Sequence, residues 1–204
     1  MTSDHRLPSN QRTLGVIGVG LIGGSMALGL RKVGWRVVGY DPDPDVRSLL
    51  EDLSIVDEVA GSLEEVVDGD VDLIVVAAPP KATIEILAMI DTDVPTMDVT
   101  GVKSPVIRVA STIPKFIGTH PMAGRETAGP RAATAALFKG ATWVVVEGGD
   151  GDATHLVESV IAELGARVVR MEAADHDRAV AAISHLPHLV AGALLAGAVD
   201  VPDA

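Results

Sequence analysis

The sequence of 204 residues contains no cysteine, and aromatic residues make up only 2% of it. The absence of cysteine excludes disulfide bonds and thiol chemistry. The chain is also short of positive charge, since 16 Lys and Arg residues face 28 Asp and Glu residues and leave a formal net charge of −12. A surface of that sign repels polyanions, so we expect no nucleic-acid partner.

The N-terminus lacks the apolar segment that a signal peptide contains, and we therefore expect a cytoplasmic protein. Residues 1–12 are polar and without periodicity, and we expect them to be flexible. The chain is rich in aliphatic residues. Hydrophobic residues make up 48% of it, and they are mostly Val, Ala, Leu and Ile. That composition is typical of buried parallel strands and of the helices that pack on them.

Apolar runs of strand length alternate with helical segments over residues 13–172. The expected strands are residues 14–18, 36–40, 72–77, 96–99, 116–118, 142–146 and 167–170. The expected helices are residues 21–33, 45–52, 81–90, 105–111, 130–137 and 154–164. This alternation predicts an α/β domain of the Rossmann type, in which helices cover both faces of a mostly parallel sheet.

Residues 173–204 follow a different pattern, a long helical stretch that is apolar on nearly every face. His185, Pro187 and His188 leave about a dozen uninterrupted apolar residues, fewer than the roughly 20 that a bilayer needs, so we expect no membrane span. We expect Asp175 to cap this helix and Asp177 to lie in its first turn. A helix that is apolar all round must be buried, and one Rossmann layer can cover only one side of it, which indicates a second domain or a partner subunit.

A Gly-x-Gly-x-x-Gly sequence, typical of dinucleotide-binding loops, directly follows the first expected strand. Gly18 permits a tight turn, Gly20 lets the backbone approach a pyrophosphate, and Gly23 lets helix and strand pack closely. Leu21 and Ile22 open the helix, whose N–H groups point toward bound phosphates. The glycines could also serve only to make a turn.

Asp41 ends the second expected strand about 20 residues further on, where an acidic residue meets the ribose hydroxyls of a dinucleotide. A carboxylate there repels the 2′-phosphate of NADP, and Pro42 rather than Arg follows it, which favours NAD. The alternative is that Asp41 only caps a loop. Ala78 and Pro79 follow the next strand at its carboxyl edge, where they either line the cofactor cleft or simply end the strand and begin a helix.

His120 follows the strand expected at 116–118 and is the candidate catalytic residue. An enzyme that oxidises an alcohol needs a group to take the hydroxyl proton as hydride leaves, and histidine has a pKa suited to this. Pro121 and Gly124 stiffen the loop around it. The alternative is a histidine that only bonds a loop carbonyl.

Together, five motifs resemble the ordered motif set of the prephenate/arogenate dehydrogenase family of tyrosine biosynthesis, over roughly residues 14–195. They are GLIGGS (20–25), DVTGVK (98–103), GTHPMAGRE (118–126), DHDR (175–178) and SHLPH (184–188). HPMAG and SHLPH are far more specific than the glycine motif.

The resemblance implies that His120 polarises a ring hydroxyl while hydride passes to the nicotinamide. Loss of the ring carboxylate as carbon dioxide then makes the ring aromatic, giving 4-hydroxyphenylpyruvate from prephenate or tyrosine from arogenate. The resemblance also places His188 near the substrate. His185 and His188 could instead be interface residues, and an HxxH zinc site lacks a third ligand, so we expect no metal.

The substrate side carries further candidates and one departure from the family. Lys103 could pair with a phosphate, a substrate carboxylate or Asp98. Arg125 lies on the loop after His120, either solvated or as a gate over the cleft. Gly101 stands where the family usually has Ser, and Thr100 could supply a hydroxyl from another direction.

A second departure is that the family continues into a helical dimerisation domain with an Arg that binds the substrate carboxylate, whereas this chain stops at Ala204. We therefore expect residues 173–204 to be the first helices of a truncated dimerisation domain and the chain to be a homodimer. Two other functions remain open: a Rossmann dehydrogenase for another hydroxy acid, and a catalytically weak dinucleotide-binding remnant.

Overall fold

The computed structural model describes residues 11–199, so most of the segment that we expect to be flexible, residues 1–12, lies outside the described residues. The two described residues of that segment contact the folded body. The side-chain amide of Gln11 donates to the carbonyl of Gly34, and Arg12 pairs with Glu163 at 3.1 Å. The first strand begins directly after them.

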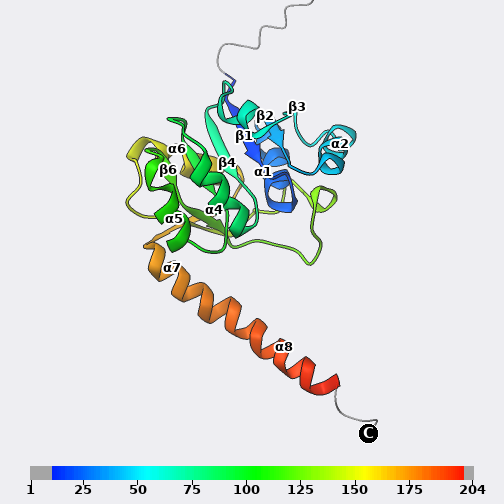
Figure 1. The fold of residues 1–204 in the computed structure, drawn as a ribbon, viewed down its shortest axis with the longest axis vertical. Coiled ribbons are helices and arrows are strands. Elements are labelled where there is room, and N and C mark those ends of the chain that lie inside the picture. The colour runs from blue at the N-terminus through cyan, green and yellow to red at the C-terminus, as the bar shows by residue number, and fades with distance from the viewer. Residues whose placement is uncertain (1–10, 200–204) are drawn as a thin grey trace, which may run out of the picture.

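The main sheet has six parallel strands in the order β3-β2-β1-β4-β5-β6 (Figure 1). They are β1 (Thr13–Ile17), β2 (Arg36–Tyr40), β3 (Glu58–Val59), β4 (Leu73–Val76), β5 (Thr96–Asp98) and β6 (Phe116–Ile117). The order reverses between β1 and β4, and that reversal opens a crevice outside the carboxyl ends of the strands. The expected Rossmann-type fold is confirmed.

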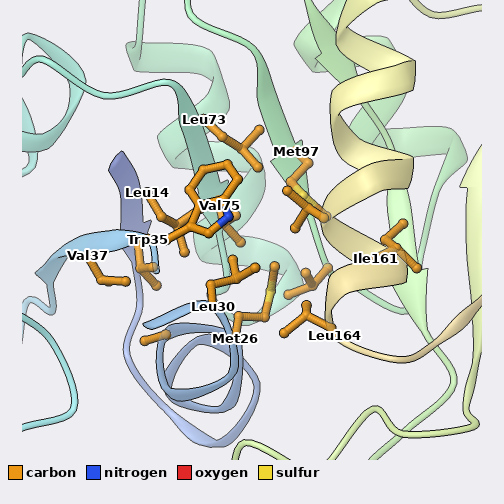
Figure 2. Close-up of a cluster of buried hydrophobic side chains, with 14 of the residues drawn as sticks. Leu14, Met26, Leu30, Trp35, Val37, Leu73, Val75, Met97, Ile161 and Leu164 are labelled. Carbon is orange, nitrogen blue, oxygen red and sulfur yellow. The ribbon is translucent and has the colours of Figure 1, made fainter. Parts of the chain in front are cut away.

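Helices cover both faces of this sheet. They are α1 (Leu21–Lys32), α2 (Pro44–Leu53), α3 (Leu63–Val67), α4 (Pro80–Met89), α5 (Ser104–Val109), which a 3₁₀ turn η1 (Ala110–Thr112) extends, and α6 (Gly151–Glu163). On β4, Leu73 and Val75 face the core that α1 and α6 cover, whereas Ile74 and Val76 face the core that α3, α4 and α5 cover. Figure 2 shows the first of these cores around Trp35. Because both of its faces are buried, β4 is apolar at every position rather than alternating.

A second, three-stranded sheet continues the chain from the edge of the first. It consists of β7 (Thr119–Pro121), β8 (Thr142–Val146) and β9 (Arg167–Met171). β7 runs antiparallel to β8, and β8 runs parallel to β9. The sequence predicted one strand at 116–118, whereas the structure ends β6 at Ile117 and begins β7 two residues later. Gly118 lies between them, and a Cβ added there would lie 2.7 Å from the terminal methyl of Ile107, so that side chain would have to shift.

The prediction of a helix at residues 130–137 was wrong. A single 3₁₀ turn, η2 (Pro130–Ala132), is followed by irregular backbone. The N–H of Thr134 donates to the Ser25 hydroxyl on α1 at 3.0 Å, and a Cβ added at Gly24 would lie 3.0 Å from Ala133. These tertiary contacts hold the segment against α1 and override its helical propensity. The short elements β3 and α3 were not expected from the sequence either.

The C-terminal segment forms one long rod that leaves the body of the molecule (Figure 1). It consists of α7 (Ala173–Val180), a π-helical turn η3 (Ala181–His185) and α8 (Leu186–Val199). The expected cap at Asp175 was wrong, because α7 begins earlier, with Glu172 at its N-cap, and Asp175 lies in its first turn beside Arg178. By length and hydropathy alone, the helix at residues 173–195 could cross a membrane, but one such helix is weak evidence for a membrane span.

The contact between α1 and β1 gives a test of the fold. A Cβ at Gly23 would lie 2.2 Å from the carbonyl oxygen of Gly18. Gly23→Ala should therefore lower the free energy of unfolding by about 1–3 kcal/mol, as measured by urea denaturation. At Gly151, the first residue of α6, no described atom lies within 4 Å of an added Cβ. Gly151→Ala is the control, and equal stability of both variants would contradict this packing.

Candidate functional site

A cleft of about 530 Å³ lies at the carboxyl ends of β1, β2 and β4, where the strand order reverses. Its lining includes five of the residues that the sequence predicts for the cofactor: Gly18, Gly20, Asp41, Ala78 and Pro79. The other three do not line it. Leu21 and Ile22 are half-buried in the first turn of α1, and Gly23 is buried against β1.

The glycine loop has the geometry that a dinucleotide phosphate requires. Gly18 has a φ of +91°, and an added Cβ would lie 2.7 Å from the carbonyl oxygen of Ala77, so only glycine fits there. At Gly20 no described atom lies within 4 Å of an added Cβ. Open space above bare backbone at the start of α1 can admit an anionic group close to the helix N-terminus.

Asp41 links this loop to β2. One of its carboxylate oxygens accepts the backbone N–H of Val19 at 3.0 Å, and the other accepts the N–H of Asp43 at 3.1 Å. Each carboxylate oxygen can accept a second hydrogen bond, so capacity remains for the hydroxyls of a ribose. Asp41 therefore shapes the cleft as well as lining it.

His120 lies in the middle of β7, half-buried, where it pairs with Val144 of β8. Its Nδ1 lies 2.9 Å from Nε2 of His176 on α7. A Cβ added at Gly101 would lie 3.5 Å from Cε1 and Nε2 of the His120 ring. The structure thus brings together His120 and Gly101, two of the residues singled out from the sequence.

His176 and Asp177 are the site residues that sequence reasoning missed. The motif DHDR was noted, but no role was given to its histidine. His176 is 1% exposed, and its Nδ1 lies 2.9 Å from Oδ1 of Asp177. Asp177 accepts the backbone N–H groups of Lys103 at 2.7 Å and Ser104 at 2.8 Å, so its carboxylate caps α5 rather than only serving its own helix.

The Asp177 carboxyl is held ionised. Burial raises its pKa, but the hydrogen bonds from Ser104, His176 and the backbone outweigh burial and hold that pKa well below its usual value. The bonds from the start of α5 also fix the position of the carboxylate. Asp177 is therefore an anchored hydrogen-bond acceptor.

Lys103 forms a buried ion pair with Asp98, one of the three partners that the sequence left open. Both side chains are 0% exposed, and the ammonium also donates to the carbonyl of Thr119. Burial lowers the pKa of Lys103, and the charge of Asp98 opposes that shift. The hydroxyl of Thr100 is likewise committed, to Asp98 at 2.6 Å and to the carbonyl of Val102 at 3.0 Å. Both side chains are buried, and their hydrogen bonds hold in place the loop that carries Gly101.

The remaining substrate-side candidates are Arg125 and His188. Arg125 is exposed on the loop between β7 and η2, as is Glu126. His188 lies near the start of α8, but its side chain, like that of His185, falls outside the described part of the structure. Among the described residues, no group of three side chains could hold a metal ion.

The buried ion pair gives a second test. Removing one partner leaves an uncompensated buried charge, so Lys103→Met should lower the free energy of unfolding by about 3–5 kcal/mol. Lys81→Met is the matched control, because Lys81 and Glu85 form a solvent-exposed pair 3.9 Å apart on α4, and its loss should cost less than about 1 kcal/mol. Urea denaturation of both variants measures the difference, and similar losses would contradict the assignment.

Comparison with known proteins divides the chain between the α/β domain and the C-terminal rod, as the structure does. A family model described as the nucleotide-binding domain of prephenate dehydrogenase matches residues 26–170, and the model of its dimerization domain matches residues 172–201. The prephenate dehydrogenases of Lactococcus lactis and Bacillus subtilis are 32% and 30% identical to this chain, covering 88% and 90% of it. The matches cover 52% and 53% of those relatives, so the chain spans about half their length.

Solved structures are similar over most of the chain. The prephenate dehydrogenase of A. aeolicus, in complex with hydroxyphenyl propionate and NAD+, has a TM-score of 0.86 and 29% identity over 95% of this chain and 71% of that one. The arogenate dehydrogenase of Synechocystis has a TM-score of 0.78 and 30% identity over 94% of this chain and 70% of that one. Sequence, fold and site geometry agree: the chain belongs to the prephenate dehydrogenase family.

Proposed function

We propose that this protein is an NAD-dependent prephenate dehydrogenase, which oxidatively decarboxylates prephenate to 4-hydroxyphenylpyruvate in tyrosine biosynthesis. The observation that carries the proposal is the position of His120. It lies on β7, which follows β6 across a single residue, next to Gly101, which follows β5. Both therefore stand at the edge of the sheet where β1 and β4 open the dinucleotide cleft. A proton acceptor and a hydride acceptor at one edge are what the oxidation requires.

NAD is the proposed cofactor, and the residues present fit it. Gly20 leaves space for the pyrophosphate, and Asp41 lines the cleft with a carboxylate that would repel the extra phosphate of NADP. The relative from A. aeolicus was solved with NAD+. When bound, the nicotinamide supplies the hydride acceptor, a chemistry that protein side chains do not offer.

The chain's own residues would bind the ring hydroxyl and manage its proton. Nε2 of His120 accepts a hydrogen bond from that hydroxyl. It takes the hydroxyl proton as hydride leaves the ring carbon that bears the hydroxyl. The electron pair of the bond to the ring carboxylate then moves into the ring as carbon dioxide departs, and the ring becomes aromatic. The proton held on His120 can return to the oxygen, which completes the phenol.

Other residues have supporting roles in this proposal. Lys103 and Thr100 hold the loop of Gly101 against His120 through Asp98. Gly101, which lacks a side chain, leaves room for substrate beside the ring. Arg125, on its exposed loop, and His188 remain proposed substrate contacts. Because the curated relatives from L. lactis and B. subtilis are named prephenate dehydrogenases, prephenate is favoured over arogenate.

His120→Asn tests the proposed role of the histidine. Asn can hydrogen-bond the hydroxyl but cannot take its proton, so turnover should fall by about 10²-fold or more, while NAD still binds. NADH absorbance with prephenate measures turnover, and a titration with NAD measures binding. His155→Asn, on the exposed side of α6, is the control and should leave turnover unchanged. Unchanged turnover in His120→Asn would remove His120 from the mechanism, and an unmodified protein that produces no NADH from prephenate would overturn the proposed function.

We also propose that the rod formed by α7, η3 and α8 is the interface of a homodimer. Its exposed apolar side chains include Leu189 (71%), Leu194 (69%) and Leu195 (69%), a surface that favours burial against another chain. The match of the dimerization-domain model to residues 172–201 supports an interface between subunits rather than a membrane span. A cytoplasmic location is part of the same proposal, since the reaction draws on soluble NAD and a soluble substrate.

Light scattering tests the interface. The unmodified protein should have about twice the 21.1 kDa mass of one chain. Leu189→Asp with Leu194→Asp should shift it to the monomer, because a charge inside an apolar interface is costly. Val33→Asp, at an exposed apolar position after α1, should have no effect. A monomeric unmodified protein at micromolar concentration would contradict the proposal.

A further inference from the structure

Three side chains from two distant segments form a continuous hydrogen-bonded series behind the proposed catalytic histidine. Nδ1 of His120 lies 2.9 Å from Nε2 of His176, although the two residues are 56 apart in the chain. Nδ1 of His176 lies 2.9 Å from Oδ1 of Asp177. The two imidazole rings meet edge to face, with centroids 5.1 Å apart and an angle of 76° between their planes.

The direction of these hydrogen bonds follows from the donors and acceptors available. The Asp177 carboxylate already accepts two backbone N–H groups, and as an ionised group it can only accept. Nδ1 of His176 must therefore carry a proton. A neutral imidazole has one N–H, so Nε2 of His176 is an acceptor, and Nδ1 of His120 must donate to it.

The same reasoning reaches the far side of the His120 ring. With its single proton on Nδ1, neutral His120 has a lone pair on Nε2. That nitrogen lies 3.5 Å from where a Cβ of residue 101 would stand, on the side that we assign to the substrate. A neutral histidine in water carries its proton mainly on Nε2, and in that form the nitrogen could not act as a base.

The Asp177 end of the series is anchored to the loop that carries Gly101. Asp177 is bound by the backbone of Lys103 and Ser104 at the start of α5, a few residues after Gly101 in the same loop. His176 is 1% exposed, so water does not compete for its ring nitrogens. A buried histidine whose two nitrogens are committed in opposite senses has a defined orientation and a defined tautomer.

We propose that His176 and Asp177 are positioning residues that hold His120 in the Nδ1–H tautomer and accept its proton during the reaction. The proposal rests on the proposed function. As the substrate O–H bond breaks, its proton binds Nε2 of His120, and the Nδ1 proton of His120 can move to Nε2 of His176. His176 is then an imidazolium whose Nδ1–H faces the Asp177 carboxylate, so the positive charge is neutralised inside the protein. In these steps the protein gains one proton, that of the substrate hydroxyl, and reversal returns it to the phenol oxygen.

Nuclear magnetic resonance of protein labelled with ¹⁵N-histidine tests the tautomer without any substrate. At a pH of about 8, above the usual histidine pKa of about 6.5, long-range ¹H–¹⁵N correlations distinguish the two N–H forms. We expect Nδ1–H for His120 and His176, and Nε2–H for His155, which is exposed on α6 and serves as the internal control. Nε2–H at His120 in the unmodified protein would overturn the proposal.

Two substitutions of His176 separate positioning from simple packing. The amide oxygen of His176→Gln can still accept from Nδ1 of His120, so the Nδ1–H tautomer should persist and part of the activity should remain. His176→Leu removes the acceptor, so His120 should change to Nε2–H and kcat should fall by at least about 10-fold, with a smaller change in KM. Equal kcat in both variants, or an unchanged tautomer in His176→Leu, would overturn the proposal. If His176→Leu does not fold, the spectra of the unmodified protein and of His176→Gln still decide.

The same measurements distinguish the two proposals from each other. Should the unmodified protein show the Nδ1–H tautomer but no reduction of NAD with prephenate, the proposed function fails while the hydrogen-bond direction holds. Should it reduce NAD while His120 shows Nε2–H, the positioning role fails and the proposed function stands.

Discussion

The carboxylate of Asp98, fully buried at the end of β5, is the group on which the arrangement of the site depends. It accepts hydrogen bonds from the ammonium of Lys103, from Thr100, and from the backbone N–H of Thr119 at 3.1 Å. A buried carboxylate is tolerated only when its charge is matched and its lone pairs are used. These bonds join β5, the loop that follows it and β7. The position of His120 on β7 therefore depends on the hydrogen bonds that the buried Asp98 carboxylate requires.

The site then divides into two halves along the same edge of the sheet. One half, over β1, β2 and β4, is a cleft with exposed backbone at Gly20 and a carboxylate at Asp41. The other half, over β5 to β7, is built from buried charged and imidazole groups with fixed hydrogen-bond directions. The first half suits a ligand that brings its own charge and reactivity. The second suits a proton that must be moved without water.

The C-terminal rod links this site to assembly. Asp177 belongs to α7, yet its carboxylate caps α5 beside the site, and α7 runs through η3 into the exposed apolar helix α8. Anything that covers α8 therefore also restrains the helix that carries His176 and Asp177. The chain spans about half the length of the L. lactis and B. subtilis relatives that it matches.

Three features could be predicted from the sequence because they depend on near neighbours: the Rossmann-type alternation, the glycine loop of Gly18 and Gly20, and the aspartate at the end of β2. Their spacings are local and carry a steric or electrostatic requirement of their own. Local patterns failed at 130–137, where packing on α1 excludes the helix that the composition favours, and at Asp175, where α7 begins earlier than its charge pattern indicates. Three other features became visible only in the folded chain: Lys103 pairs with Asp98 inside the protein, β7 to β9 form a separate sheet, and His176 lies behind His120. Each of these features depends on hydrogen bonds that local sequence patterns do not encode. The bond between His120 and His176, for example, joins residues 56 apart in the chain. Tertiary packing determines which buried donors and acceptors come within hydrogen-bond distance of each other.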